Sequence, residues 1–396
     1  ASRLFEDAVV AAAWAPSVSV LDLTRHDGDL RGFDGGFSDG ANGYLVPYYG
    51  GKVARFSLTD FGSVDTLDLT LTDAGLKGFV GGFTDGDHGY VVPYFNGVPF
   101  GKVARFALTG FGNPQVLDVS STETAFRGGF TDGTHGYLAP SLAMGMPAKV
   151  VRFTLADFGN VEAFALSRDH EFVGGFTDGE YGFLVPNNGG GFERGKVVRF
   201  TLMDFDIASV RELHLPLIAF AGGFYDGDWG YVVPCKDDSG TDSGKVARFR
   251  LSAFDGADVL DLGLTDADLK GFWGGFLDGD YGYVVPNRHG KAARFLLLDF
   301  ATVEILDLTA FDVDLKSFRG GFAAMGHGYF VPNHNGADFF GKVVRFSTTT
   351  ASSSTTRTSS TSTTSTTSVT TSSTRSTTST ATGTSTTPTT TTTTTR

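Results

Sequence analysis

Several features that would point directly to a function are absent from this chain of 396 residues. A single cysteine, Cys235, means that no disulfide can form within the chain. No apolar run reaches the roughly 18 residues that a membrane-spanning helix needs. The motif H-E-x-x-H and a phosphate-binding glycine loop are also missing, and the single G-x-S-x-G match, residues 36–40, falls within a glycine-rich segment that recurs along the chain. We therefore expect a protein held together by packing, with no membrane span, no enzymatic activity, no catalytic or metal-binding residue and no cofactor.

Basic residues are scarce in the first 346 residues. This part contains 28 Lys and Arg against 44 Asp and Glu, a net charge of −16. A nucleic-acid partner requires a basic face that neutralises phosphates, and an anionic membrane surface attracts basic segments. Both are therefore excluded as expected partners. No Asn is followed two residues later by Ser or Thr, so any glycan must be O-linked.

The chain is organised around a thirteen-residue frame, G-G-F-x-D-G-x-x-G-[YF]-x-x-P, of which residues 81–93 are one copy. Six further copies follow the same pattern with small departures. The seven copies open at Gly35, Gly81, Gly128, Gly174, Gly222, Gly274 and Gly320. A period of 46 to 52 residues indicates a repeat architecture in which each unit buries its surface against its neighbours.

Each repeat predicts four short strands. Strand a is Phe-x-Gly-Gly-Phe and leads through an Asp-Gly turn to strand b, Gly-Tyr-x-x-Pro; Asp-Gly is a strong hairpin signal. Strand c is Gly-Lys-Val-Ala-Arg-Phe, and strand d is Leu-Asp-Leu-Thr. Four strands per repeat with Gly and aromatic punctuation are typical of a β-propeller blade. An open β-solenoid is the alternative.

The two ends of the repeat region predict how the ring closes. Residues 18–24 match strand d but precede the first strand a, whereas the last repeat ends at strand c. The fold class is therefore all-β, a seven-bladed propeller of four antiparallel strands per blade over residues 18–346, with its last blade completed by residues 18–24. Residues 1–17 form an N-terminal arm, either a short helix or an extended docking segment.

Residues 347–396 form a separate tail. All but eight of these residues are Ser or Thr, with three Arg and no acid. Such a composition cannot bury a core and is typical of an O-glycosylated, mucin-like stalk. The O-glycosylation sites that we name are Thr348, Thr349, Thr350, Thr355, Thr356, Thr363, Thr364, Thr386, Thr387, Thr389, Thr390, Thr391, Thr392 and Thr393.

Three polar positions recur in the repeats, and each has a structural interpretation beside a functional one. The frame Asp, as in Asp85, could ligate calcium, but an Asp-Gly turn that bonds its own backbone explains it better. The Lys and Arg of strand c could bind anionic sugar, or could pair with acids of strand d or the turn, linking blades. His88, His135 and His327 share a hairpin position, where packing of the turn is the simpler interpretation than a metal.

The loops between strands b and c vary most in length and carry exposed-type aromatic and Met side chains. Loops on a rigid scaffold are where recognition is usually placed. The predicted binding or assembly face consists of Tyr48, Tyr49, Tyr94, Phe95, Phe100, Met144, Phe192, Phe339 and Phe340.

The repeat G-G-F-x-D-G-x-x-G-Y-x-x-P, followed by G-K-V-[AV]-R-F and L-D-L-T, resembles a family of secreted repeat proteins of algae and other aquatic protists with a seven-bladed propeller. A propeller with a Ser/Thr tail also resembles subunits of extracellular glycosylated fibrils. These resemblances imply an extracellular structural subunit, with the propeller as bead, the tail as connector, and glycans and other copies of itself as partners. The alternative is a lectin-like module that binds carbohydrate or protein on a mucin-like stalk.

Overall fold

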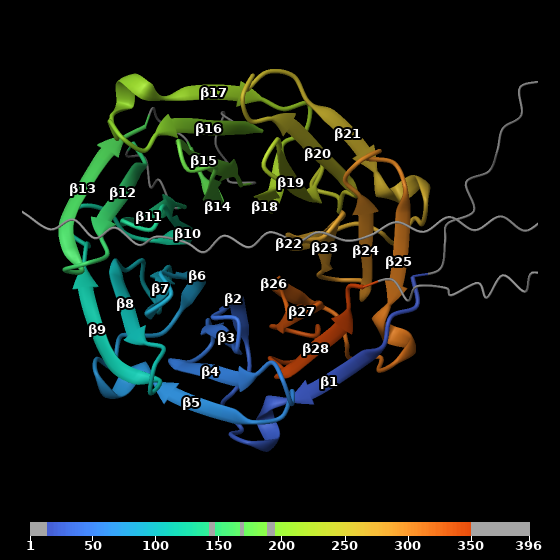
Figure 1. The fold of residues 1–396 in the computed structure, drawn as a ribbon, viewed down its shortest axis with the longest axis horizontal. Coiled ribbons are helices and arrows are strands. Elements are labelled where there is room, and N and C mark those ends of the chain that lie inside the picture. Colours follow the sequence, from blue (N-terminus) through green and yellow to red (C-terminus); the bar gives the residue numbers. More distant parts are fainter. Residues whose placement is uncertain (1–13, 142–146, 167–169, 188–194, 350–396) are drawn as a thin grey trace, which may run out of the picture. The chain divides into compact units, whose positions relative to one another are not determined.

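The computed structural model describes residues 14–141, 147–166, 170–187 and 195–349. These residues form seven separate four-stranded antiparallel sheets arranged around one axis (Figure 1). The expected seven-bladed β-propeller is confirmed. In each blade the first strand lies nearest the axis and the fourth lies at the rim.

The blades follow one another along the chain. Blade 1 contains β2 (Phe33–Ser38), β3 (Asn42–Pro47), β4 (Lys52–Ser57) and β5 (Val64–Asp68). Blade 2 contains β6 (Phe79–Thr84), β7 (His88–Pro93), β8 (Lys102–Ala107) and β9 (Gly112–Asp118). Blade 3 contains β10 (Phe126–Thr131), β11 (His135–Pro140), β12 (Lys149–Thr154) and β13 (Gly159–Ala165). Blade 4 contains β14 (Phe172–Thr177), β15 (Tyr181–Pro186), β16 (Lys196–Thr201) and β17 (Arg211–His214).

Blade 5 contains β18 (Ala219–Tyr225), β19 (Trp229–Lys236), β20 (Lys245–Arg250) and β21 (Asp258–Asp261). Blade 6 contains β22 (Phe272–Asp278), β23 (Tyr281–Pro286), β24 (Lys291–Leu296) and β25 (Val303–Asp307). Blade 7 contains β26 (Phe318–Ala324), β27 (His327–Pro332), β28 (Lys342–Ser347) and β1 (Val18–Asp22). Short 3₁₀ turns lie at η1 (Leu23–Arg25), η2 (Leu69–Leu71), η3 (Ile207–Ser209), η4 (Leu262–Leu264) and η5 (Leu308–Ala310).

The double glycine of the frame has two different physical causes, shown here for blade 2. In β6 the pairing with β7 shifts by one residue between Phe79 and Gly82, which is a β-bulge, and the same shift occurs in all seven blades. Gly81 occupies the bulge with φ 75°, a conformation that favours glycine. Gly82 is needed because a Cβ there would lie 2.5 Å from the carbonyl oxygen of Tyr90.

The bulge glycines also pack against one another around the axis. A Cβ on Gly81 would lie 2.8 Å from the Cα of Gly128 in the next blade. The same close approach joins neighbouring blades around the ring except between blades 4 and 5, since a Cβ on Gly174 would meet nothing within 4 Å. Only residues without a side chain permit this approach.

The Phe after the double glycine lies between blades. Phe83 of blade 2 stacks on Tyr90 at a centroid distance of 4.9 Å and packs with Leu138 and Val151 of blade 3. Burying one such ring stabilises the fold by roughly 1.5–3 kcal/mol. Seven equivalent rings therefore hold the blades together.

The ring closes in the way that the sequence predicts. The N-terminal strand β1 pairs antiparallel with β28 in continuous register, from Val18 opposite Phe346 to Asp22 opposite Lys342. The first and last strands of the repeat region thus share one sheet, and blade 7 has no missing strand at its rim.

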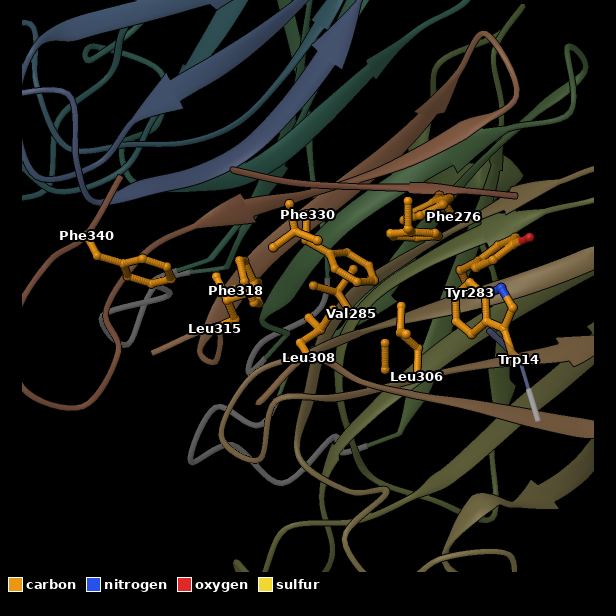
Figure 2. Packing of buried hydrophobic residues seen from close by; sticks show 13 residues of the cluster. Trp14, Phe276, Tyr283, Val285, Leu306, Leu308, Leu315, Phe318, Phe330 and Phe340 are labelled. Carbon is orange, nitrogen blue, oxygen red and sulfur yellow. The ribbon is translucent and has the colours of Figure 1, made fainter. Parts of the chain in front are cut away.

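Trp14 completes this closure with a side chain from outside the repeats. In the other blades a Phe in the turn between strands c and d is buried, as Phe111 is, at 5.7 Å from Phe106 of its own blade and 5.8 Å from Tyr44 of the preceding blade. Blade 7 has no such turn, because its third and fourth strands come from opposite ends of the chain. Trp14 takes this place, 5.1 Å from Phe346 and 5.6 Å from Tyr283 (Figure 2).

Candidate functional site

One position of the repeat departs from the seven-fold pattern in its chemistry. It is the residue between the first Phe of strand a and the double glycine, beside the axial bulge. The seven residues are Asp34, Val80, Arg127, Val173, Ala221, Trp273 and Arg319. Four of them are charged or carry an indole nitrogen, and we call Asp34, Arg127, Trp273 and Arg319 the axial cluster.

The axial cluster is joined across the ring. A guanidinium nitrogen of Arg319 lies 3.0 Å from a carboxylate oxygen of Asp34 in the neighbouring blade, and its Cζ lies 4.3 Å from the Trp273 ring. The Cζ of Arg127, from blade 3, lies 5.9 Å from the ring of Trp273, which belongs to blade 6. Because blades 3 and 6 lie on opposite sides of the ring, this contact bridges the axis (Figure 1).

The cluster holds charges in a poorly solvated place. Asp34 is 4% exposed, and its burial raises the pKa of its carboxyl, although Arg319, Arg127 and a hydrogen bond from Trp273 oppose the shift. Arg127 donates a hydrogen bond of 2.8 Å to the Tyr94 hydroxyl. Burial likewise raises the pKa of Glu171, against the opposing charge of Arg127.

A pocket of 410 Å³ opens beside the axial cluster between blades 6 and 7. Its walls come from the b–c loops of both blades and from the loop that enters β26. The cationic and imidazole side chains of the wall are Arg288, Lys316, Arg319 and His334. The amides are Asn287, Asn333 and Asn335, and the wall contains no acidic residue. The pocket therefore has a local charge opposite to that of the chain.

The predicted contact face is divided by the structure. Tyr49 and Phe95 are 52% and 42% exposed, and Tyr49 packs on Phe339 at a centroid distance of 4.4 Å. Tyr48 lies near the axial cluster, since its ring is 5.8 Å from the Cζ of Arg319. Tyr94, as the partner of Arg127, also belongs to the mouth of the axis.

Phe100 and Phe340 do not belong to an exposed contact face. They are 7% and 8% exposed and pack edge-on against Phe79 and Phe318, the first residues of their blades. The prediction failed because a loop of variable length can still direct one aromatic ring into the core. Met144 and Phe192 lie outside the described residues.

The Asp of the frame is a turn residue that bonds its own backbone, which is the interpretation that the sequence favoured over calcium binding. Asp85 accepts hydrogen bonds from the amides of Asp87 and His88, at 2.9 and 2.7 Å, and from the Tyr90 hydroxyl at 2.7 Å. This last contact is repeated in blades 1, 3 and 5. Among the residues that the structure describes, no group of three His, Cys, Asp or Glu side chains is placed to hold a metal ion.

The Arg of strand c stabilises the ring in a way that only partly matches the prediction. Arg152 donates to Glu162 of strand d at 2.7 Å, within its own blade. The link to the next blade is a 2.7 Å hydrogen bond to the carbonyl oxygen of Leu202, together with stacking over Phe205 at 4.3 Å. Pairing with the acid is thus within a blade, and a carbonyl group connects the blades.

The Lys of strand c binds the loop that enters its blade. The ammonium group of Lys52 lies 2.8 Å from both Asp27 and Asp29, in the loop that follows β1 of blade 7. The same pairing raises the pKa of Lys291, beside Asp266 and Asp268, to about 12. His88 and His135 lie beside their turn carboxylates, at 3.6 Å from Asp85 and Asp132.

Thr348 must be removed from the predicted glycosylation sites. It is 6% exposed, its hydroxyl donates to Asp278, and its carbonyl oxygen accepts 3.1 Å from Arg294. Thr348 occupies the place that a Leu of the c–d turn holds in other blades, so it belongs to the core. Thr349 is exposed, and the other named threonines lie outside the described residues.

The fold and axial cluster define a seven-bladed propeller whose axis carries mixed charge at the loop face. The chain matches no protein-family model, and no curated protein sequence matches it. Among solved structures it is similar to a streptogramin B lyase structure, with a TM-score of 0.62 and 11% identity over 85% of this chain and 99% of that chain. It is also similar to a hydrazine synthase structure from Kuenenia stuttgartiensis, with a TM-score of 0.56 and 14% identity over 76% of this chain and 93% of that chain.

At these identities the likeness shows the fold alone. No described helix is long and apolar enough to cross a membrane.

The sequence analysis did not find the axial cluster, although the sequence contains a signal for it. A position that varies from Asp to Val to Trp inside an otherwise constant frame marks the place where the blades differ in chemistry.

Proposed function

We propose that this protein is a non-enzymatic structural subunit of an extracellular glycoprotein fibril or cell-surface coat. The propeller is the rigid bead, and the O-glycosylated Ser/Thr tail connects one copy to the next. The observation that carries this proposal is the polarity of the bead. The first and last residues that the structure describes, Trp14 and Thr349, lie at the face formed by the a–b and c–d turns (the turn face), opposite the face formed by the b–c loops (the loop face).

The two faces follow from hydrogen bonds at the last described residues. The amide of Thr348 donates to the carbonyl oxygen of Gly326 at 3.0 Å, in the turn between β26 and β27. The b–c loops lie at the opposite ends of these strands. Trp14 packs beside Phe346, near the same turn face. This arrangement supports a bead that is tethered from one face and makes contacts through the other.

Exposed aromatic side chains on the loop face supply a contact surface for another copy. Tyr49 and Phe95 are large, apolar and about half exposed. Large aromatic side chains are enriched in protein interfaces, where they contribute much of the binding energy. Their place on the face opposite Trp14 and Thr349 supports assembly of beads through these loops.

The test compares assembly of the secreted, glycosylated full-length chain with that of two double variants, by sedimentation velocity and electron microscopy. Tyr49→Ala with Phe95→Ala should reduce assembly at least tenfold. The matched control is Met203→Ala with Leu298→Ala, since these side chains are 91% and 89% exposed but lie in c–d turns at the other face. A monomeric full-length chain without O-glycans by intact-mass analysis would refute the proposal.

A second candidate is a carbohydrate- or protein-binding module carried on the stalk. The observation that favours it is the axial cluster with its adjoining pocket, because a structural bead alone does not require polar groups at the axis. Binding of a soluble ligand by the full-length chain in a monomeric state would favour this candidate over the first.

A further inference from the structure

We propose that the pocket between blades 6 and 7 binds the acidic group, a carboxylate or a sulfate ester, of an anionic saccharide. This inference rests on the second candidate function and names its ligand class. The pocket faces the loop side of the propeller and borders the axial cluster through Arg319. Three features carry the inference: the charge of the wall, its rigidity and its neutral polar groups.

The charge of the wall is unusual for this chain. Arg288, Lys316 and Arg319 line the pocket, and no carboxylate lines it, although the protein has a net charge of −13. The pocket of 640 Å³ at blade 5 provides the contrast. There Lys236, Lys245 and Lys270 share the wall with four Asp, so its positive charge is neutralised.

The cationic side chains of the wall have hydrogen-bond donors that are not fully used within the protein. Within the described part of the chain, Lys316 makes no ion pair, and Arg288 is 62% exposed with only a distant 3.8 Å contact to Asp242. Arg319 uses one terminal nitrogen for Asp34, which leaves other guanidinium donors of its fork. An anion in the pocket would therefore find the ammonium group of Lys316 and the remaining guanidinium donors of Arg288 and Arg319.

The wall is rigid where the ligand would dock. Asn333 is 3% exposed, and its amide donates to the carbonyl oxygen of Phe33 at 2.7 Å. Ser317 has φ 60°, a left-handed conformation that a residue with a side chain adopts only when its surroundings impose it. Stacking on Trp273 at 4.3 Å orients Arg319. A preformed site loses less conformational entropy on binding.

The neutral groups of the wall indicate a hydroxyl-rich ligand. The side chains of Asn287, Asn335 and Ser317 provide amides and a hydroxyl, which both donate and accept hydrogen bonds. Sugar hydroxyls also do both, whereas an acidic peptide offers mainly acceptors from its side chains. Cations for the acidic group beside amides for the hydroxyls therefore match an anionic saccharide better than a peptide.

The experiment is calorimetric titration of the full-length chain with four probes at low ionic strength. Tetragalacturonate supplies carboxylates, a κ-carrageenan tetrasaccharide supplies sulfate esters, maltotetraose is the neutral sugar and hexaglutamate is the acidic peptide. We expect at least one acidic sugar to bind ten times more tightly than both maltotetraose and hexaglutamate. The affinity should fall as salt is raised.

The variant Lys316→Ala with Arg288→Ala should weaken that binding at least tenfold, whereas Lys270→Ala in the blade 5 pocket should leave it unchanged. Both changes are at exposed or half-exposed side chains, and thermal unfolding checks that the fold is kept. The inference would be overturned if hexaglutamate bound as tightly as the acidic sugars. It would also be overturned if the double variant bound the acidic sugar as tightly as the wild type does. If maltotetraose bound tightly, and equally to the wild type and the double variant, the anionic site would be overturned. The proposal of a carbohydrate-binding propeller would then still stand.

Discussion

Replacing Trp14 with Ala tests how the ring is closed. The indole is 7% exposed and belongs to the core between blades 6 and 7, with Tyr283, Phe346 and Leu306 (Figure 2). It also lies 4.9 Å from the Cζ of Arg294, which is itself buried. Its loss would remove the only aromatic ring in the described chain that fills the vacant turn position of blade 7.

The expected loss follows from the contacts. Truncation of a buried aromatic side chain to Ala costs about 3–5 kcal/mol, because burial is lost and a cavity remains. Two edge-on aromatic contacts, each worth about 0.5–1.5 kcal/mol, and a cation–π contact of about 0.5–2 kcal/mol are part of this total. The loss is a large fraction of the 5–15 kcal/mol that typically separates folded from unfolded protein.

The measurement is equilibrium unfolding of the full-length chain in urea, followed by tyrosine and tryptophan fluorescence and by circular dichroism. With a slope of about 3 kcal/mol per molar urea, Trp14→Ala should lower the midpoint by roughly 1–2 M. Trp14→Phe, which restores the residue type of the other blades, should lower it far less. Phe311→Ala is the control at a 55% exposed ring. If Trp14→Ala and Phe311→Ala unfold at the same midpoint, the arm does not close the ring.

Three further predictions concern the frame itself. Gly81→Ala should destabilise the protein by about 1–3 kcal/mol more than Gly174→Ala, measured by urea unfolding, because both positions have positive φ but only Gly81 has backbone of the next blade within 3 Å. Tyr90→Phe should cost about 1.5–3 kcal/mol through its lost bond to Asp85, whereas Tyr329→Phe should be close to neutral, since Ala324 replaces the Asp in blade 7. Burial acts to raise the pKa of the Asp85 carboxyl, yet hydrogen bonds from Tyr90 and from the His88 and Asp87 amides hold this pKa below its ordinary value. Its stabilising effect is therefore present above the unfolded pKa of about 3.9 and is lost as the pH falls through the lower folded pKa, so thermal melts between about pH 5 and pH 2 should fall more steeply for the wild type than for Asp85→Asn.

The strands and their order could be predicted because the signals are local. An Asp-Gly turn fixes a hairpin, and Pro ends strand b in six of the seven blades, as at Pro93, whereas β19 continues past Pro234 to Lys236. The recurrence of the double glycine in all seven repeats was also visible in the sequence. The bulge that gives its two members different tasks was not predicted, since it depends on the register between β6 and β7.

The candidate site was predicted only in its general location. The loop face was chosen from variable aromatic loops, and Tyr48 and Tyr94 do lie at the mouth of the axis. Phe100 and Phe340, chosen by the same rule, are core residues. Residue type and loop length do not decide which way a ring points, because that depends on the space left by the adjacent blade.

The sequence by itself determined the number of blades, their four strands and the closure of the last blade by residues 18–22. These follow from a pattern that repeats every 46 to 52 residues and from turns within a few residues of each other. Only the tertiary structure brought Arg127 to Trp273 across the axis and Trp14 to the gap of blade 7. The physical reason is that ring closure sets these contacts, and it joins residues from different blades for which no local propensity exists.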